Sequence, residues 1–454
     1  MKGICMKKPA LVTRMTAMLL LLLMLLPALA ACGEDSPALT PGEGANPVLS
    51  GNEIDADEYP LLGGIPTLYI DLAGNRSIGE LTKEEYVGGS ATLVGADAAD
   101  NLVSVPLEMK GRGNYSWYDM EKKQYAIKFE EKQRVLGMGS ARKWVLISNY
   151  SDKSFLRNFL TLNLAKDIGM PYTTACRYVN LVVNGEYHGL YLLTEKIEVH
   201  ADRVDIDTAN GDVLMEIDLP GRHYNECDYC IDIDATLPVP MHIRICEPEL
   251  EDYGEEVMAA AHETATKLTT AMIPGLNRGL GKLSEIIDVQ SFVDWYIVNE
   301  FVRNGDSAFW TSCYCYIEDG ILHMGPVWDY DTCMGNQNNS AYFAPEGFYI
   351  SEQQRAYWYY RLMRNNDFKA LVKERWTELR DAGIFDDMFA SIDETAAYID
   401  ESIALDNERW PGGPLRTDLR GNKSCYSAEE ETQYIKKWVK TRLAWLDKQW
   451  YIKH

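Results

Sequence analysis

The spacing of apolar residues changes once along this chain, and that change limits the folds it can adopt. Apolar and polar residues alternate, as in strands with one buried face, over residues 65–70, 102–110 and 124–129. Apolar residues recur at helical spacing over residues 255–272, 289–303, 368–380 and 429–450. A sheet-rich front and a helical back predict an α+β fold with two lobes, over about 61–250 and 251–454. Ligands commonly bind in the cleft between such lobes.

Local signals predict a helix and a hairpin in the front half. Apolar residues follow helical spacing over 151–168, with Ser151 or Asp152 as the expected N-cap and Gly169 as the stop. The Asn-Gly pair at 184–185 lies between two β-rich runs, which is the strongest short signal for a hairpin. A further strand pair is expected over 212–219 and 229–234.

The first 31 residues have the composition of a secretory signal. Positive charges precede an apolar run from Met18 to Leu26, and small residues then lead to Ala31. The sequence LAACG around Cys32 resembles the lipobox of bacterial lipoproteins, which implies cleavage before Cys32 and a lipid on that residue. We therefore expect an extracytoplasmic protein anchored by lipid to the bacterial cell membrane. Residues 32–60, rich in Gly, Pro and acids, are expected to form a flexible linker.

The charge balance narrows the possible partners. The chain has 44 Lys and Arg against 68 Asp and Glu, a net charge of −24. This excess of acids argues against nucleic-acid binding, because a phosphate backbone needs a cationic face, and we expect no nucleic-acid partner. The excess of acids fits a solvated surface protein or one that binds divalent cations.

Two aspartates flank a predicted hairpin in the back half. Asp306 follows a helix, and strands are expected over 312–317 and 321–328 with a tight turn at 319–320. Paired strands lie less than about 5 Å apart, and each residue advances a strand by about 3.3 Å, so strands of similar length return the chain to its starting point. Asp306 and Asp329 are therefore predicted to meet at one end of the hairpin.

Further oxygen ligands follow Asp329. Asp331 supplies a third carboxylate and Asn336 a neutral oxygen, a set of groups that suits Mg²⁺ or Mn²⁺. The absence of a paired His argues against a zinc hydrolase. Asp329 and Asp331 could instead simply cap a loop. Trp328 and the preceding Gly-Pro favour the metal interpretation, since an apolar surrounding penalises a carboxylate that no cation satisfies.

A second polar region lies upstream, in KGRGN at 110–114 and KKQYAIKF at 122–129. Its glycines expose backbone N–H groups, and its cations could bind phosphate. Exposed lysines on a strand are usually only solvated, so the region alone is a weak signal. In an acidic protein, however, a cationic strip facing a cluster of carboxylates would suit a nucleoside triphosphate with its metal ion.

These segments resemble, in the same order, those of the CotH spore-coat kinases, atypical members of the protein-kinase-like fold. The matching motifs are KGRGN with Ser116-Trp117, KKQYAIKF, RKWVLISNYSDKSFLRNFL at 142–160, VNGEYHGLYLLTEKIE at 183–198, NGDS at 304–307 and GPVWDYD at 325–331. The resemblance implies a two-lobed, protein-kinase-like fold. It also implies transfer of the γ-phosphoryl group of ATP, with Mg²⁺ or Mn²⁺, to hydroxyls of a surface or coat protein, for example a Ser-rich one.

The resemblance also implies roles for individual residues. Asp306 would be the catalytic-loop aspartate, which orients or deprotonates the acceptor hydroxyl. Asp329 would bind the metal, with Asp331 assisting. The residues implied for nucleotide binding are Lys128 or Lys123 for the phosphates, Arg112 as a further candidate, and Glu195 near adenine at the hinge between the lobes. The motifs do not choose among the cations.

Departures from the family pattern leave alternatives open. Thr311 occupies the position of the second metal-binding Asn, so Asn336 or Asp331 would have to replace it. Nucleoside triphosphate is scarce outside the membrane, so the fold could instead serve as a non-catalytic cell-surface or polysaccharide-binding scaffold. The DxD at 329–331 would also suit a metal-dependent glycosyltransferase, which predicts binding of UDP. The presence of both Asp306 and Asp329 favours an enzyme over a scaffold, because unpaired carboxylates in a cleft cost stability.

Overall fold

The computed structural model describes residues 54–218, 229–233, 237–336, 344–411 and 427–453. The expected signal and the lipidation residue Cys32 lie outside these residues, as does nearly all of the expected linker. Among the described residues, no helix combines the length and apolar character needed to cross a membrane.

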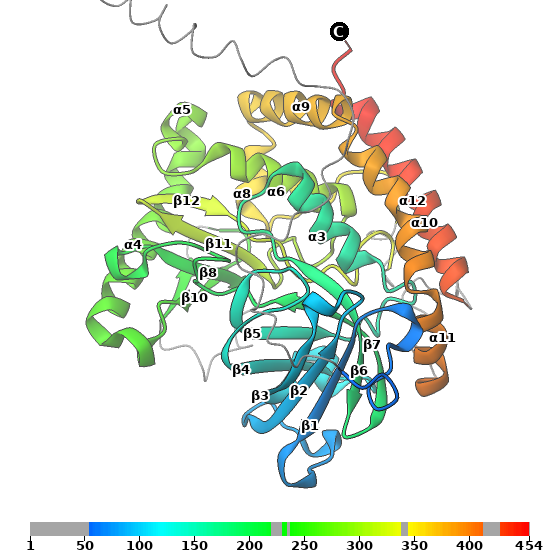
Figure 1. Cartoon of the computed structure of the whole chain (residues 1–454). Coiled ribbons are helices and arrows are strands. Elements are labelled where there is room, and N and C mark those ends of the chain that lie inside the picture. Colours follow the sequence, from blue (N-terminus) through cyan, green and yellow to red (C-terminus); the bar gives the residue numbers. More distant parts are fainter. Residues whose placement is uncertain (1–53, 219–228, 234–236, 337–343, 412–426, 454) are drawn as a thin grey trace, which may run out of the picture. The chain divides into compact units, whose positions relative to one another are not determined.

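The front of the chain forms a closed barrel in the order β1-β2-β3-β4-β5-β7-β6 (Figure 1). Its strands are β1 (Thr67–Leu72), β2 (Val87–Val94), β3 (Leu102–Arg112), β4 (Gln124–Arg134), β5 (Ser140–Ile147), β6 (Cys176–Val183) and β7 (Glu186–Glu195). Neighbouring strands are antiparallel except β1 and β6, whose parallel pairing closes the barrel. Alternate side chains such as Ile127 and Phe129 fill the interior, as the period-two pattern predicted for this segment.

The predicted helix and hairpin lie between and within these strands. The hairpin β6–β7 turns through Asn184 (φ 50°) and Gly185 (φ 78°), which confirms the Asn-Gly prediction. Helix α3 (Arg157–Ile168) ends at Gly169, which adopts a left-handed conformation, as expected. Its start is later than predicted, because the Asp152 carboxylate accepts the N–H groups of Ser154 and Arg157 and holds residues 152–156 in a turn.

A second sheet has the order β12-β11-β8-β10-β9. Its strands are β8 (Val213–Asp218), β9 (Cys230–Ile233), β10 (Met241–Glu247), β11 (Cys313–Glu318) and β12 (Ile321–Met324). The predicted strands at 212–219 and 229–234 exist, but they do not pair with each other, because the unpredicted β10 lies between them. This sheet draws strands from both sides of residue 250, so the expected boundary between the lobes does not separate the two sheets.

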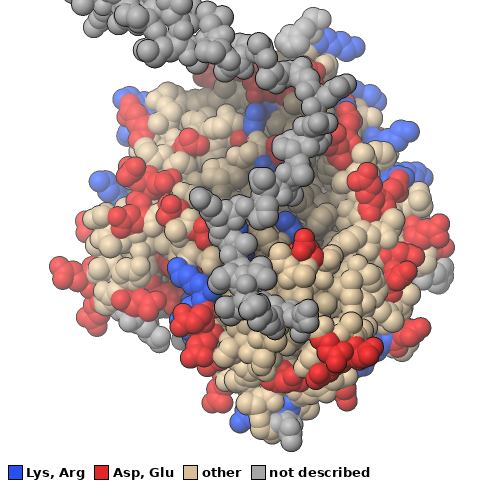
Figure 2. Space-filling model, in the orientation of Figure 1, with Lys and Arg blue, Asp and Glu red and all other residues tan. Residues whose placement is uncertain are grey.

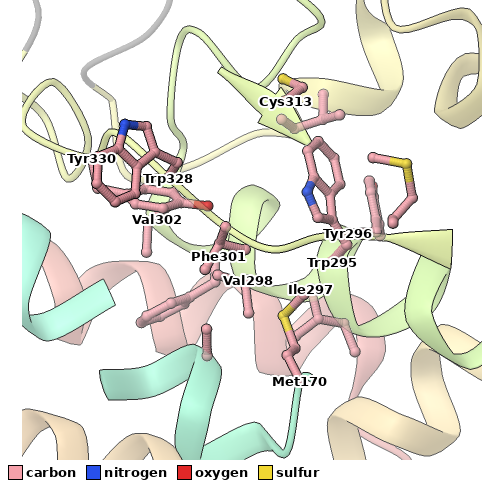
Figure 3. Packing of buried hydrophobic residues seen from close by; sticks show 14 of the residues in the cluster. Met170, Trp295, Tyr296, Ile297, Val298, Phe301, Val302, Cys313, Trp328 and Tyr330 are labelled. Carbon is pink, nitrogen blue, oxygen red and sulfur yellow. The ribbon is translucent and has the colours of Figure 1, made fainter. Parts of the chain in front are cut away.

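Helices dominate the back of the chain (Figure 1). They are α4 (Leu250–Arg278), α5 (Leu280–Leu283), α6 (Val289–Val302), α8 (Tyr357–Leu362), α9 (Asn366–Asp381), α10 (Ile384–Tyr398), α11 (Asp400–Arg409) and α12 (Ala428–Trp450), while the short α2 (Tyr115–Tyr118) belongs to the front. Helix α6 runs through the core, where Trp295, Val298 and Phe301 are buried (Figure 3). The fold is therefore α+β, with a sheet-rich front and a helical back.

The outer face of the barrel packs against the helices in one apolar core. Val145, Tyr178 and Leu192, on the outer face of the barrel, belong to the same apolar cluster as α3 and α6, whereas the barrel interior forms a separate cluster. A buried ion pair between Lys122 and Asp406 also joins the residues before β4 to α11. The outer face of the barrel is thereby fixed against the part of the chain that carries Asp306 and Asp329.

Candidate active site

The segment that carries Asp306 begins where α6 ends. Arg303 adopts a left-handed conformation (φ 53°) and turns the chain out of the helix. The Asn304 side chain then donates from Nδ2 to the backbone oxygen of Asp329 at 3.0 Å, and its Oδ1 accepts the N–H of Asp306 at 3.4 Å. One amide therefore connects the two segments that the hairpin was predicted to bring together.

Asp329 lies between two buried aromatic side chains. Trp328 and Tyr330 are buried, and Figure 3 shows them in the core near Val302 of α6. The Tyr330 hydroxyl donates to Oδ1 of Asn299 on α6 at 2.9 Å. Asp329 itself has a positive φ of 66°, a conformation that is uncommon outside glycine. Burial of its neighbours Trp328 and Tyr330 holds the backbone in this conformation. Burial of alternate residues leaves Asp329 and Asp331 partly accessible to water.

The three aspartates form one group, here called the acidic cluster: Asp306, Asp329 and Asp331. Burial is the main cause that raises the pKa of Asp331, to about 8, and the negative charges of Asp329, Asp306 and the nearby Asp152 raise it further. A hydrogen bond from the Ser151 hydroxyl to the Asp331 carboxylate acts in the opposite direction. The carboxylates are therefore close enough to repel one another, and a cation would relieve that repulsion.

The loop that carries Asp331 is fixed from two sides. Nδ2 of Asn336 donates to the backbone oxygens of Ser151 at 2.9 Å and Asp331 at 2.7 Å, so its amide nitrogen holds the loop together. The fully buried Arg157 donates to the backbone oxygen of Cys333 at 2.8 Å and pairs with both Asp152 and Glu431 of α12.

Sequence reasoning did not assign Ser151, Asn304 or Arg157 to the site. They lie within the motifs RKWVLISNYSDKSFLRNFL and NGDS, so the motifs contained the signal, but only the folded chain shows what these residues contact.

Among the cations considered, Arg112 interacts with the residues around Asp329. It lies at the end of β3, donates to Oε1 of Gln124 at 2.8 Å and lies over the Trp328 ring, 5.5 Å from its centroid. Burial lowers the pKa of Arg112, while the charges of groups facing it, Asp329 among them, act in the opposite direction. A barrel cation therefore faces the residues around Asp329, as an anion site beside the acids requires.

The other implied nucleotide-binding residues have different surroundings. Lys128 pairs with Glu108 at 3.7 Å, and Lys123 donates to the backbone oxygen of Trp117. Glu195 accepts the backbone N–H groups of Gly139 at 3.2 Å and Ala175 at 2.9 Å. Within the described ranges, the structure does not bring Lys128, Lys123 or Glu195 into contact with the acidic cluster.

The amino-acid sequence matches one known protein family. The family model for the CotH kinase protein matches residues 109–446. The chain belongs to the CotH kinase protein family. The match confirms the resemblance read from the motifs, and it includes Arg112, the acidic cluster and most of α12. No curated protein matches the chain.

Kinase families in general use a nucleoside triphosphate with a divalent metal, and the site of this CotH kinase family member must offer oxygen ligands for both to bind. The described residues contain no group of three or more His, Cys, Asp or Glu placed to hold a metal ion by themselves. Mg²⁺ commonly takes only one or two carboxylates from a protein and the remaining oxygens from phosphates and water. The acidic cluster therefore fits a metal ion that arrives together with a nucleotide, whose phosphates supply the missing oxygen ligands. It does not fit a site that holds the metal ion with protein ligands alone.

A separate cavity lies elsewhere in this CotH family chain. It has a volume of about 380 Å³ and is lined by the end of α3, the loop before β6 and residues 195–204, including Glu195, Lys196 and Arg203. It shares no residue with the acidic cluster. The cavity is therefore distinct from the site formed by Asp306, Asp329 and Arg112.

Proposed function

We propose that this member of the CotH kinase family is an atypical kinase that transfers the γ-phosphoryl group of ATP to hydroxyl groups of a surface or coat protein. The observation that carries the proposal is the meeting of Asp306 and Asp329 beside Asp331. Asp306 precedes and Asp329 follows the β11–β12 hairpin, and Arg112 faces them from the barrel. Base, metal ligand and phosphate-binding cation are the groups that phosphoryl transfer needs.

Each residue has a defined part in this proposal. Asp306 accepts or orients the proton of the acceptor hydroxyl, with its backbone held by Asn304. Asp329 and Asp331 would hold Mg²⁺ or Mn²⁺, which when bound neutralises charge on the nucleotide phosphates. Arg112 is the cation proposed to bind those phosphates; its nearness to Asp329 and Trp328 supports this choice. The two-lobed kinase-like arrangement is part of the same proposal.

Location is a further part of the proposal. The basic and apolar N-terminus and Cys32 support export and lipid anchoring to the bacterial membrane. The acceptor would then share the cell surface with the enzyme. Acidic side chains are spread over the face of the molecule in Figure 2, with Lys and Arg in smaller groups between them, which fits a solvated surface protein.

Thermal shift with ATP or UDP, each with and without Mn²⁺, tests this proposal. A stabilisation by ATP that requires Mn²⁺ supports the kinase. A UDP shift would support a glycosyltransferase instead, and no shift with either nucleotide would support a binding scaffold.

We expect Asp329→Asn to keep the thermal midpoint of the unliganded protein and to lose the MnATP shift. Asp306→Asn is the matched control, because it should still bind MnATP while losing phosphoryl transfer. Undiminished MnATP binding by Asp329→Asn would refute the metal assignment.

A further inference from the structure

An exposed tryptophan follows the proposed catalytic aspartate by one helical turn. The backbone N–H of Trp310 donates to the backbone oxygen of Asp306 at 2.9 Å. Its neighbour Phe309 is buried and packs against Trp358 of α8, with ring centroids 5.5 Å apart. The Trp310 side chain, in contrast, keeps 38% of its surface exposed and is therefore accessible to a partner.

Arg355 lies on this tryptophan. Its guanidinium carbon is 3.8 Å from the centroid of the Trp310 ring, which is the contact distance of a stacked pair. The two segments are also joined beside Asp306, where the Tyr349 hydroxyl donates to the backbone oxygen of Gly305 at 2.9 Å. The segment that carries Arg355 is thus fixed along the residues that carry Asp306.

Among the residues that the structure describes, no carboxylate pairs with the charge of Arg355. Within the same residues, six other buried or partly buried arginines pair with a carboxylate, while two more donate to an amide oxygen. The six are Arg157, Arg203, Arg244, Arg375, Arg380 and Arg442, and the two are Arg112 and Arg361. In the described part of the chain, the Arg355 side chain makes no ion pair and no hydrogen bond. Burial alone lowers its pKa, with no carboxylate acting in the opposite direction. Such a free arginine is noteworthy in a protein with 68 acidic residues.

Stacking leaves one part of the guanidinium available. When the plane of an arginine lies on an aromatic ring, its N–H groups point outward along the edge and can bind a carboxylate or phosphate with two parallel hydrogen bonds. The ring holds the side chain in place, so less conformational entropy is lost on binding. Trp310 and Arg355 therefore present a rigid anion-binding edge next to Asp306.

We propose that Trp310 and Arg355 form an acceptor-recognition site, which binds an anionic group of the acceptor chain close to the hydroxyl that is phosphorylated. This inference rests on the proposed kinase function and specifies its acceptor. One helical turn advances about 5.4 Å and an extended chain about 3.3 Å per residue, so the anionic group lies within about three residues of the hydroxyl. Either an Asp or Glu side chain or a previously phosphorylated serine supplies the required chemistry.

Peptide kinetics with the full chain in detergent test the site. Four acceptor peptides differ at one residue near the serine, which is Glu, phosphoserine, Gln or Lys. We expect kcat/KM to be about tenfold higher for an anionic peptide than for the Gln peptide. The Glu and phosphoserine arms show which source of charge is preferred. Arg355→Glu should remove this preference and favour a Lys-containing peptide instead.

A matched control separates recognition from general damage. Arg364→Glu changes another arginine that is stacked on an aromatic ring, that of Tyr360. The guanidinium of Arg364 already donates to the backbone oxygen of Ser351 at 3.2 Å. It should leave the peptide preference unchanged. Equal kcat/KM for the anionic and Gln peptides would overturn the proposal. So would a higher KM for ATP in Arg355→Glu with the peptide preference retained, since Arg355 would then serve the nucleotide.

Direct binding distinguishes failure of this site from failure of the kinase proposal. Fluorescence anisotropy with labelled Glu and Gln peptides measures affinity without any turnover. If no peptide is phosphorylated but the Glu peptide binds about tenfold more tightly, and Arg355→Glu abolishes the difference, the recognition site stands and the kinase function fails. If phosphorylation occurs and the two peptides bind equally, the recognition site fails and the kinase function stands.

Discussion

The buried pair between Lys122 and Asp406 gives a sharp test of how the barrel is attached to the helices. Lys122 is fully buried, pairs with Asp406 of α11 and donates to the backbone oxygen of Leu190 at 2.6 Å. Asp406 also accepts the Leu190 N–H at 2.8 Å. Replacing Lys122 by Met leaves a buried carboxylate without its cation, which costs about 3–5 kcal/mol of unfolding free energy. At about 2 °C per kcal/mol for a large domain, the thermal midpoint falls by about 6–10 °C.

A double-mutant cycle separates the charge from the packing. Asp406→Asn keeps an oxygen for the Leu190 N–H, so Lys122→Met with Asp406→Asn contains no buried charge and should be more stable than Lys122→Met alone. Lys123→Met is the matched control, since Lys123 is only partly buried and donates to one backbone oxygen. We expect this control to cost less than about 1 kcal/mol. Calorimetry that shows a loss below 1 kcal/mol for Lys122→Met, or simple additivity in the cycle, would refute the reasoning.

Two further expectations concern pH and thiol chemistry. Burial, with the nearby charge of Arg409 as a second cause, lowers the pKa of His188 to about 4. The unfolded chain therefore takes up a proton below pH 6.5 that the folded chain refuses, and stability is lost as pH falls from about 6.5 toward 4. The thermal midpoint of His188→Gln should fall less over this range; an identical fall would contradict the assignment. Burial also raises the pKa of Cys176 and Cys333 to about 12, so a thiol reagent at pH 8 should label them only after denaturation, and rapid labelling of the native protein would contradict their burial.

The sequence predicted the position of the two aspartates in the acidic cluster better than it predicted the cation beside them. The position of Asp306 before a hairpin and Asp329 after it was enough to predict that the two would meet, because strand spacing and rise are nearly constant. The cation was less predictable. Lys128, Lys123 and Arg112 all lie on or next to β3 and β4, and only the register Arg112↔Gln124 with the Trp328 contact places one of them beside Asp329. The surroundings of Glu195 were also not predictable, since the two backbone N–H groups that it accepts, those of Gly139 and Ala175, come from segments distant in sequence.

The sequence by itself determined the local elements and the family. Periodicity, the Asn-Gly turn and Gly169 depend on neighbouring residues, so they could be read directly, and the ordered motifs indicated the CotH kinases. Tertiary structure decided the closure of the barrel by β1 and β6, the insertion of β10 between β8 and β9, and the meeting of Trp310 with Arg355. Such contacts join residues far apart along the chain. Their formation depends on how all the elements pack together, which the spacing within any one segment does not specify.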